Sequence, residues 1–380
     1  MSARIVVLQS SHAAHHPRHH QRFGAALAAA GYDVCTMAQP DLTDGHRDVV
    51  PVQYLPRRRH RLTRMLTGPV TVARALRDRP AALAVVCLDL LPWAVLAHKL
   101  RRDLVVVYDS NEQYDLYVEV KDWLPQFARR PVARLVRALE PRLGARLNAV
   151  TTAVPATHEK FRAAGARAIL VRNFPPSALL DGERRKDRFS YDILVGGSLP
   201  PAQFPLLGDT AVKLRRRLGR PARWVVAARH FGSRDETLLD AALRDRGVRE
   251  DVTLLHDRPF EEVRRLAADS AVAFAPYPAD GQYPVALPIR LFEYMAWGIP
   301  FVTSELPALA DLLGGAEVGR LAAPGDTGAY AAALAELVTA PNIGRRLGDN
   351  GRRLVRSHLN WESEARKLVA LYDELLGAAR

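Results

Sequence analysis

Short apolar runs alternate with amphipathic segments along the first half of the chain. The runs have the length and the branched residues of buried strands, whereas the apolar positions between them recur with the helical period. The predicted strands are Arg4–Gln9, Asp33–Thr36, Leu83–Cys87, Leu104–Tyr108, Ala149–Ala153 and Ala168–Val171. A helix is predicted over Gln21–Ala30, ending at Gly31. This alternation is typical of a parallel sheet covered on both faces, so we predict an α/β fold.

The same alternation restarts after a proline-rich stretch. Pro175 and Pro176 precede the polar run Asp181–Arg188, a composition typical of a linker. The strands predicted beyond it are Asp192–Val195, Trp224–Ala227, Val252–Leu255, Ala271–Ala275 and Pro300–Thr303. We therefore predict two doubly wound, Rossmann-like domains, residues 1–176 and 177–360, with a ligand cleft between them. The amphipathic C-terminal helix, residues 361–380, is expected to pack back on the first domain.

A long amphipathic helix is predicted at Pro131–Ala145. Its larger apolar residues are predicted to share one face: Val132, Leu135, Val136, Leu139 and Leu143. The arginines of this segment occupy other positions of the helix.

Composition indicates a globular protein that does not span a membrane. The chain has 380 residues, of which 48% are hydrophobic and 25% charged. No run reaches the roughly 18 apolar residues of a transmembrane helix, and the N-terminus lacks the pattern of a secretory signal. Cys35 and Cys87 are the only cysteines, which argues against a disulfide framework and a cysteine metal site. We therefore expect a cytoplasmic location.

The chain is strongly basic, with 54 Lys and Arg against 41 Asp and Glu and a net charge of +13. Such a charge suits nucleic acid, an anionic membrane or phosphorylated small molecules, although an arginine-rich genome gives the same excess. Many arginines gather between Arg57 and Arg79. This region is either a docking site for the inner face of a membrane or a phosphorylated acceptor, or a solvated surface. Nucleic acid is not expected, because no aromatic residues interleave with the arginines for base stacking.

The segment Tyr283–Pro300 has the pattern of an anion site. A helix is predicted to open at Ile289, directly after Pro288, which leaves the N–H groups of the first turn available. Arg290 adds a positive charge, and Glu293 lies one turn further on, suited to accept hydrogen bonds from a ribose diol. The alternative is an ordinary helix in which Glu293 interacts with the helix dipole.

The stretch LPIRLFEYMAWGIPFVTS, residues 287–304, resembles the donor-binding segment of the family-four retaining glycosyltransferases of the GT-B fold. Other segments resemble the same family: His12 with Pro17 and Arg18 in the first loop, Asp89 after a strand, and VYDSNE at residues 107–112. VRNFPP at residues 171–176 is similar to the hinge of the family, and residues 348–376 to its last helices.

The resemblance implies a role for each matching residue. The implied catalytic residues are Arg290, His12 and Asn111. The implied donor-binding residues are Glu293 on the ribose, Pro288 and Leu291 beside the diphosphate, and Gly196, Gly197 and Arg229. Those implied on the acceptor side of the cleft are Arg18, Asp89 and Glu112.

The sequence departs from the family at three positions. Val285 stands where many relatives have a Glu, and the stretch Ser198–Pro205 lacks the usual cation that binds the diphosphate. Arg229 or Arg234 is expected to replace that cation. Asn111 stands where relatives have a His, and an amide carries no proton at neutral pH.

The family implies transfer of a sugar from a nucleoside diphosphate sugar to a hydroxyl acceptor with retention, without a protein nucleophile, a cofactor or a metal. The acceptor classes implied are cell-envelope polysaccharide or glycolipid and antibiotic-type glycoside, phosphorylated or lipid-linked. The histidines at positions 12–20 are expected to form an active-site loop rather than a zinc site. Two alternatives remain, a catalytically silent GT-B binding subunit and a nucleotide-sugar epimerase. No Gly-x-Gly-x-x-Gly follows a strand, which disfavours a dehydrogenase.

Overall fold

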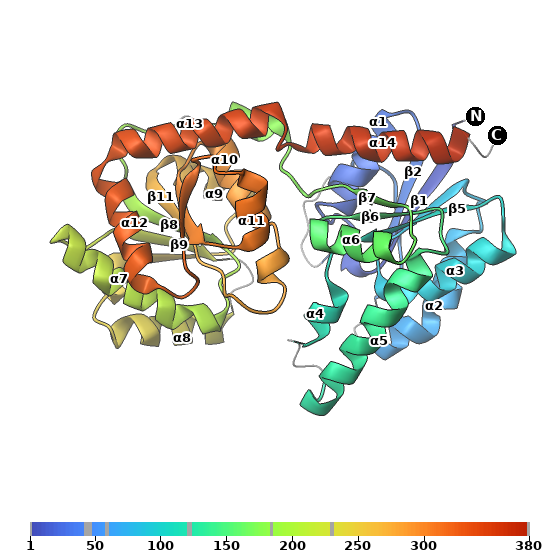
Figure 1. Cartoon of the computed structure of the whole chain (residues 1–380), viewed down its shortest axis with the longest axis horizontal. Helices are drawn as coiled ribbons and strands as arrows, with labels where there is room; N and C mark the ends of the chain where they lie inside the picture. Colours follow the sequence, from blue (N-terminus) through green and yellow to red (C-terminus); the bar gives the residue numbers. More distant parts are fainter. Residues whose placement is uncertain are drawn as a thin grey trace. The chain divides into compact units, whose positions relative to one another are not determined.

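The computed structural model describes residues 2–41, 48–57, 61–119, 124–182, 185–228 and 232–377. The chain forms two compact units. The first comprises Met1–Asn173 and Trp361–Arg380, and the second Phe174–Asn360. The chain thus passes from one unit to the other just before Pro175 and Pro176 and returns for its last helix (Figure 1).

The first unit contains a seven-stranded sheet in the order β3-β2-β1-β4-β5-β6-β7. Every neighbouring pair is parallel. The strands are β1 (Arg4–Ala13), β2 (Asp33–Gln39), β3 (Val52–Tyr54), β4 (Ala82–Val85), β5 (Val105–Ser110), β6 (Ala149–Thr152) and β7 (Ala168–Leu170). The strand order reverses between β1 and β4, which is where ligands bind in doubly wound folds.

Consecutive apolar residues are buried along the central strands, as expected where helices cover both faces of a parallel sheet. The helices of the first unit are the π-helix η1 (His19–Gly24), α1 (Ala25–Ala29), α2 (Arg61–Ala75), the 3-10 turn η2 (Leu88–Leu90), α3 (Leu91–Leu100), α4 (Tyr114–Glu119), α5 (Gln126–Gly144), α6 (Pro155–Ala163) and α14 (Trp361–Gly377). α1 and α14 lie on one side of the sheet, and α2, α3 and α5 lie on the other (Figure 1).

Helix α14 is part of the core of the first unit. The ring of Trp361 stacks on Phe23 with 5.7 Å between centroids, and Leu368 and Tyr372 are buried beside the sheet. Glu364 accepts a hydrogen bond from the backbone N–H of Arg172 at 3.0 Å.

The buried face of α5 differs from the prediction. Leu135 and Leu139, predicted to share an apolar face with their neighbours, are 56% and 46% exposed. The face that packs inward consists of Ala133, Glu140, Pro141 and Gly144. Small residues allow close approach of the helix, and the buried carboxylate of Glu140 accepts hydrogen bonds from Tyr108, Ser110 and Lys160 at 2.9–3.0 Å.

The second unit repeats the topology with a six-stranded parallel sheet in the order β10-β9-β8-β11-β12-β13. Its strands are β8 (Tyr191–Gly197), β9 (Trp224–Ala228), β10 (Val252–His256), β11 (Ser270–Ala275), β12 (Phe301–Ser304) and β13 (Gly319–Ala322). Its helices are α7 (Phe204–Leu218), α8 (Ser233–Arg244), α9 (Phe260–Ala268), α10 (Ile289–Trp297), α11 (Pro307–Leu313), α12 (Thr327–Thr339) and α13 (Pro341–Ser357), with 3-10 turns η3 (Ser177–Asp181), η4 (Pro201–Gln203), η5 (Arg249–Asp251) and η6 (Tyr283–Val285).

The predicted α/β class is confirmed, and each predicted strand is present. The prediction missed β3 and β13, whose sequences VQY and GRLA are too short and too polar to stand out. Within the described residues, no helix is long and apolar enough to cross a bilayer.

Candidate functional site

In the second unit, the central strand β8 ends in two glycines that allow an arginine to lie against the backbone. Gly197 has a φ of +96°, and a Cβ there would lie 2.5 Å from Cζ of Arg290. A Cβ on Gly196 would lie 2.8 Å from Nη1 of the same guanidinium. A Cβ at either position would have to displace the guanidinium of Arg290, and at Gly197 the positive φ favours glycine as well. The guanidinium lies at the carboxyl end of β8, next to the switch point of the sheet.

Helix α10 brings the predicted donor residues together. It begins at Ile289 after Pro288, and no described side chain caps its first turn. Arg290 and Glu293 lie one turn apart, with 3.6 Å between Nε and Oε2, and their side chains are 18% and 11% exposed. Burial acts to lower the pKa of Arg290, but Tyr294 and the carboxylate of Glu293 outweigh it and raise that pKa. The guanidinium is thus charged, partly accessible and next to the N-terminus of a helix, an arrangement suited to an anion.

For two of the predicted donor residues, the structure describes no side chain that could contact a donor. The side chain of Leu291 is fully buried in the core, so only its backbone is placed to contact a ligand. Arg229 lies outside the described residues.

The sequence analysis did not identify two tyrosines near Arg290. The rings of Tyr277 and Tyr283 are 5.6 Å apart, and the charges of Arg290 and Glu293 act on the Tyr277 hydroxyl. Tyr277 follows β11 and donates its backbone N–H to Ser304 at 2.7 Å. The sequence feature that could have identified Tyr277 is its position directly after a strand next to the switch point, where side chains face the ligand end of the sheet.

In the first unit, His12 and Asp89, at the carboxyl ends of β1 and β4, both act on the buried thiol of Cys87. Ser10 Oγ donates to the carboxylate of Asp89 at 2.7–2.8 Å. The Nδ1 atom of His12 lies 3.7 Å from Sγ of Cys87, which also contacts Ser11 Oγ at 3.2 Å. Burial acts to lower the pKa of His12, but Cys87 and nearby carboxylates raise it above its usual value.

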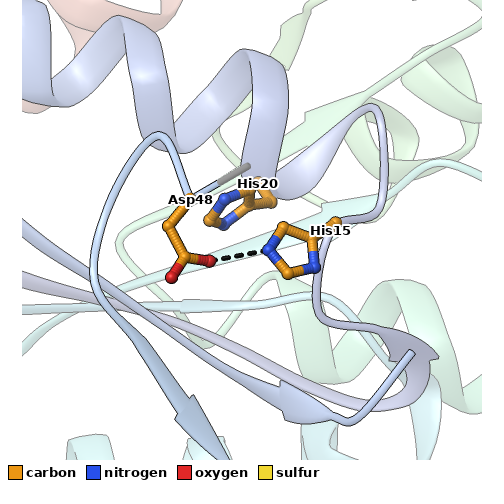
Figure 2. Close-up of side chains that lie close together, drawn as sticks. All are labelled: His15, His20 and Asp48. Carbon is orange, nitrogen blue, oxygen red and sulfur yellow. Dashed lines mark hydrogen bonds and ion pairs between the residues drawn. The ribbon is translucent and has the colours of Figure 1, made fainter. Parts of the chain in front are cut away.

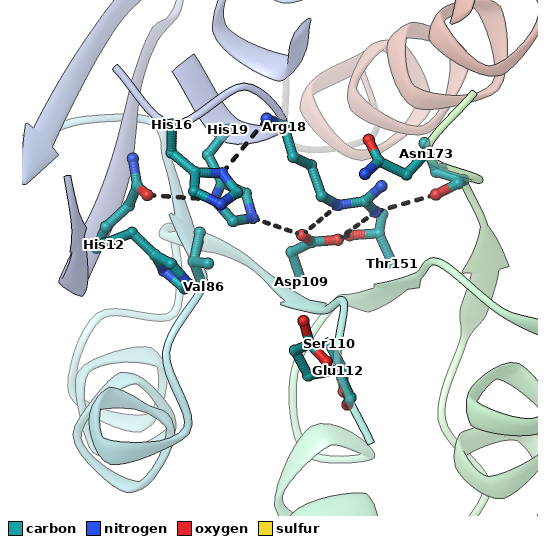
Figure 3. A network of polar contacts seen from close by, with 12 residues as sticks. His12, His16, Arg18, His19, Val86, Asp109, Ser110, Glu112, Thr151 and Asn173 are labelled. Carbon is teal, nitrogen blue, oxygen red and sulfur yellow. Dashed lines mark hydrogen bonds and ion pairs between the residues drawn. The ribbon is translucent and has the colours of Figure 1, made fainter. Parts of the chain in front are cut away.

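Arg18, predicted on the acceptor side of the cleft, lies in a buried ion pair in the first unit. Its side chain is 1% exposed, and Nε and Nη2 each donate to Asp109 at 2.8 Å (Figure 3). Nη2 also donates to the carbonyl of Val171 at 3.0 Å. Asp109 further accepts from Thr151 at 2.7 Å and lies 3.0 Å from Nε2 of His19. Burial acts to raise the pKa of Asp109, but Arg18 outweighs it and holds that pKa far below its usual value.

The sheet itself accounts for this pairing. Asp109 belongs to β5 and is 2% exposed, and a buried carboxylate needs a paired cation. Arg18 therefore joins η1 to the end of β5, and its role on the acceptor side stays a prediction.

Asn111 and Glu112 follow β5 and are half-buried. The Oδ1 atom of Asn111 is buried and has no hydrogen-bond partner among the described residues, and the same holds for Nε2 of Gln113. Glu112 is close enough to His12 for its charge to raise the pKa of that histidine. Asn111 thus has a hydrogen-bond acceptor, and Gln113 a hydrogen-bond donor, without a partner among the described residues.

The predicted histidine loop divides into separate environments. His16 and His19 stack at 4.5 Å, and burial together with neighbouring positive groups lowers their pKa values to about 2 and about 4. His15 bridges two carboxylates. Its Nδ1 lies 2.6 Å from Asp41, and its Nε2 lies 2.6 Å from Asp48, the contact drawn in Figure 2. Burial acts to lower the pKa of His15, but these carboxylates outweigh it and raise that pKa.

Among the described residues, His15, His20 and Asp48 form a group whose ligand atoms, all within 4.8 Å of one another, could surround a metal ion. Both nitrogens of His20 have hydrogen-bond partners, Nδ1 with Thr36 at 3.1 Å and Nε2 with the N–H of Val49 at 3.2 Å. Both nitrogens of His15 have partners as well, so the absence of a zinc site stays a prediction.

Two family sequence models match the chain. The model described as "Glycosyl transferase 4-like domain" matches residues 17–177, and that described as "Glycosyl transferases group 1" matches residues 191–340.

Two curated proteins share similar segments. An MMP alpha-(1->4)-mannosyltransferase of Mycolicibacterium hassiacum is 38% identical over 117 residues, which are 30% of this chain and 27% of that protein. The amylovoran biosynthesis glycosyltransferase AmsK of Erwinia amylovora is 34% identical over 104 residues, 27% of this chain and 25% of that protein. The similarity therefore spans about a quarter of each of these relatives.

Solved structures share the fold over nearly the whole chain. A sucrose-phosphate synthase of Thermosynechococcus elongatus superposes with a TM-score of 0.75 at 16% identity, covering 99% of this chain and all of that one. The Anabaena protein HepE, solved in complex with UDP-glucose, superposes with a TM-score of 0.71 at 14% identity, covering 98% of this chain and 100% of that one. At these identities the likeness shows the fold.

Proposed function

Because this chain belongs to the family-four glycosyltransferases of the GT-B fold, we propose that it transfers a sugar from a nucleoside diphosphate sugar to a hydroxyl acceptor with retention of configuration. The observation that carries the proposal is the Arg290 guanidinium, which lies against Gly196 and Gly197 with Glu293 beside it. A partly exposed cation, a helix N-terminus and a carboxylate match the diphosphate and the ribose of such a donor.

The donor is proposed to bind the second unit through three contacts. Glu293 accepts hydrogen bonds from the ribose diol, and Arg290 pairs with the diphosphate. The backbone of Pro288–Leu291 donates from the first turn of α10. Arg229 is proposed as the further cation, because Ser198–Pro205 contains none.

The chemistry proposed for this site is departure of the nucleoside diphosphate followed by attack on the same face of the sugar. The bond between the anomeric carbon and the phosphate oxygen breaks, and its electron pair stays on the diphosphate. Arg290 and the helix N–H groups stabilise that growing charge. The acceptor oxygen then bonds to the anomeric carbon, and its proton passes to a phosphate oxygen of the leaving group. Neither a metal nor a cofactor enters this scheme.

The first unit is proposed to contact the sugar and the acceptor. Asn111 is suited to bind a sugar hydroxyl, because its buried Oδ1 has no partner among the described residues. His12, Asp89 and Glu112 are proposed to bind and orient the acceptor hydroxyl. The acceptor classes proposed are cell-envelope polysaccharide or glycolipid and antibiotic-type glycoside, phosphorylated or lipid-linked.

A cytoplasmic location is proposed together with this activity. Cys35 and Cys87 are both free thiols in the described structure, as a reducing compartment maintains them.

The direct experiment is to incubate the protein with UDP-, GDP-, ADP- and dTDP-sugars and a set of hydroxyl acceptors, with and without chelator. Release of diphosphate only with acceptor, and a product with the anomeric configuration of the donor by NMR, is the expected result. Epimerised donor without acceptor would instead assign the site to an epimerase. Binding without any turnover would assign the chain to a silent subunit.

A further inference from the structure

Most exposed large apolar side chains of the protein gather on three helices of the first unit. Of the thirteen such side chains in the described structure, eight lie on α2, α3 and α5. They are Met65, Leu66 and Val70 on α2, Leu96 and Leu100 on α3, and Phe127, Leu135 and Leu139 on α5. Phe127, Leu66 and Leu100 are 84%, 80% and 77% exposed, far more than the partial exposure usual at a core edge.

These side chains form outward stripes along their helices. On α5, Phe127, Pro131, Leu135 and Leu139 recur every fourth residue and are all exposed. Positions four apart lie on the same side of a helix, so the stripe faces away from the sheet. The same spacing relates Pro92, Leu96 and Leu100, the exposed stripe of α3.

The three helices are neighbours. α3 contacts both α2 and α5, and all three lie on the side of the sheet opposite α1 and α14 (Figure 1). On α2, Gly68 packs directly against the ring of Trp93 of α3. We call the surface formed by the exposed side chains of α2, α3 and α5 the apolar-basic face.

The charge of this face is of one sign. The sequences of α2 and α3 contain no acidic residue, and α5 contains only Glu140, which is 1% exposed and paired with Lys160. Exposed basic residues flank the stripes, among them Arg130, Arg134 and Arg142 on α5. An exposed acid of the neighbouring helix α4, Glu119, lies 3.6 Å from Arg137 of α5. Cations beside an uncovered apolar stripe, on helices that expose no acid of their own, are the pattern of helices that lie in the interface of an anionic bilayer.

We infer that the apolar-basic face docks the protein on an anionic lipid surface. The stripes insert their apolar side chains below the level of the headgroups, while the arginines bind lipid phosphates. A protein partner would need an apolar groove whose rim carries only acidic residues. An anionic bilayer has an apolar interior and negatively charged headgroups across its whole surface, so it matches the face without a special shape. The inference concerns the first unit by itself and holds whether or not the second unit binds a nucleotide sugar.

This face overlaps in part with the region that the sequence suggested. Membrane docking was one of the two alternatives for Arg57–Arg79, of which residues 58–60 lie outside the described residues. Helix α2 lies within that region and contributes exposed apolar side chains as well as Arg74, and α3 and α5 add the remaining apolar anchors. Charge alone gives weak, salt-sensitive binding, and the stripes supply the part that salt does not screen.

The test is flotation of the full chain with vesicles of phosphatidylcholine alone or with one third phosphatidylglycerol. The wild type is expected to float with the anionic vesicles only. The triple variant Phe127→Ser, Leu135→Ser and Leu139→Ser is expected to lower the partition coefficient by roughly a hundredfold at all salt concentrations. The triple variant Arg130→Ala, Arg134→Ala and Arg142→Ala is expected to lower it by a similar factor at low salt and less at high salt.

Matched controls separate the face from net charge and from misfolding. Arg216→Ala, Arg217→Ala and Arg356→Ala remove the same charge from exposed positions of the second unit and are expected to leave flotation within about threefold. The thermal midpoint of each variant is expected to stay near that of the wild type, because all the replaced side chains are exposed. Failure of the wild type to float, or equal loss in the control, would overturn the proposal. So would a dimer of the free protein that the serine variant dissociates, since that result would assign the face to a second copy.

Discussion

The two units place an arginine at the carboxyl end of similar sheets and use it in opposite ways. Arg18 of the first unit is 1% exposed and bound at two points by Asp109. Arg290 of the second unit is 18% exposed, and the nearest atoms of its ion pair with Glu293 are 3.6 Å apart. One guanidinium neutralises an internal charge, whereas the other retains the capacity to bind an anion.

The difference shows what decides whether a charged residue of a motif acts on a ligand. Asp109 is a strand residue with no access to water, so its charge is compensated from within the unit. Glu293 lies on a helix beside a glycine-lined strand end, where the guanidinium of Arg290 packs against the backbone. The predictions below test this contrast in order of decreasing expected effect.

Replacing Arg18 by Ala is expected to destabilise the protein by about 3–5 kcal/mol, because it leaves Asp109 buried without its cation. Chemical denaturation followed by circular dichroism measures the loss. Arg142→Ala, at an exposed position of α5, serves as the control and is expected to change stability by less than about 0.5 kcal/mol. A small loss for Arg18→Ala would contradict its structural role.

The same pair gives a pH dependence. The folded-state pKa of Asp109 lies far below its usual value, so its stabilising contribution is complete above the unfolded pKa of about 4 and declines as the pH falls further. The stability difference between wild type and Asp109→Asn is therefore expected to shrink below about pH 4. A difference that grew on acidification would be incompatible with this sign.

Replacing Arg290 by Ala is expected to lower turnover by about 10²–10³-fold, because the charge opposes that of the leaving group. Affinity for the nucleoside diphosphate is expected to fall, whereas affinity for the nucleoside stays unchanged. Calorimetry with both ligands measures the contrast. Equal losses for the two ligands would exclude contact with the diphosphate.

Replacing Gly197 by Ala sharpens this test without removing the charge. A Cβ there would displace the guanidinium of Arg290, so diphosphate affinity is expected to fall by about tenfold or more. Gly315→Ala is the matched control, with a φ of +82° and no atom within 4 Å of the added Cβ. The control is expected to lose stability but not affinity.

Replacing Glu293 by Gln is expected to weaken binding of nucleoside and nucleoside diphosphate alike, by about tenfold each, because both contain the ribose. 2′,3′-Dideoxyribonucleoside diphosphates, which lack both hydroxyls of the diol, are expected to bind wild type and variant equally. An effect confined to the diphosphate would place Glu293 elsewhere in the site.

The smallest effect is expected at His15. Its folded pKa is raised by Asp41 and Asp48, so its contribution to stability is complete below the unfolded pKa of about 6.5 and declines as the pH rises through the folded value. The thermal midpoint of wild type is expected to exceed that of His15→Gln at pH 5 and to approach it at pH 9. Stabilisation by Zn²⁺ that His15→Gln abolishes would instead show that the cluster binds a metal.

Much of the fold was predictable because buried parallel strands are continuous apolar runs. The strand Leu104–Tyr108 and its neighbours stand out from the polar loops, whereas β13, with sequence GRLA, does not. The face of α5 was not predictable, because its buried side uses Ala133, Gly144 and a hydrogen-bonded Glu140 rather than large apolar residues. Leu135 and Leu139 lie on the solvent side of that helix, whereas Leu143 packs against the core.

The candidate site was predictable only where its residues are neighbours in sequence. Arg290 and Glu293 are one helical turn apart, so their proximity follows from the period of the helix. The pairing of Arg18 with Asp109 joins residues that are 91 positions apart, and the bridge from His15 to Asp41 and Asp48 joins separate loops. A motif identifies such residues but does not show whether a partner inside the protein already occupies them.

The most direct test of the account is the thermal midpoint of the wild type and Arg290→Ala in the presence of UDP, GDP, ADP and dTDP, with the matching nucleosides as references. The account predicts that one diphosphate raises the midpoint of the wild type more than its nucleoside does, and that the variant loses this difference. If no diphosphate stabilised the wild type, or if the variant responded equally, the second unit would not contain the donor site proposed here.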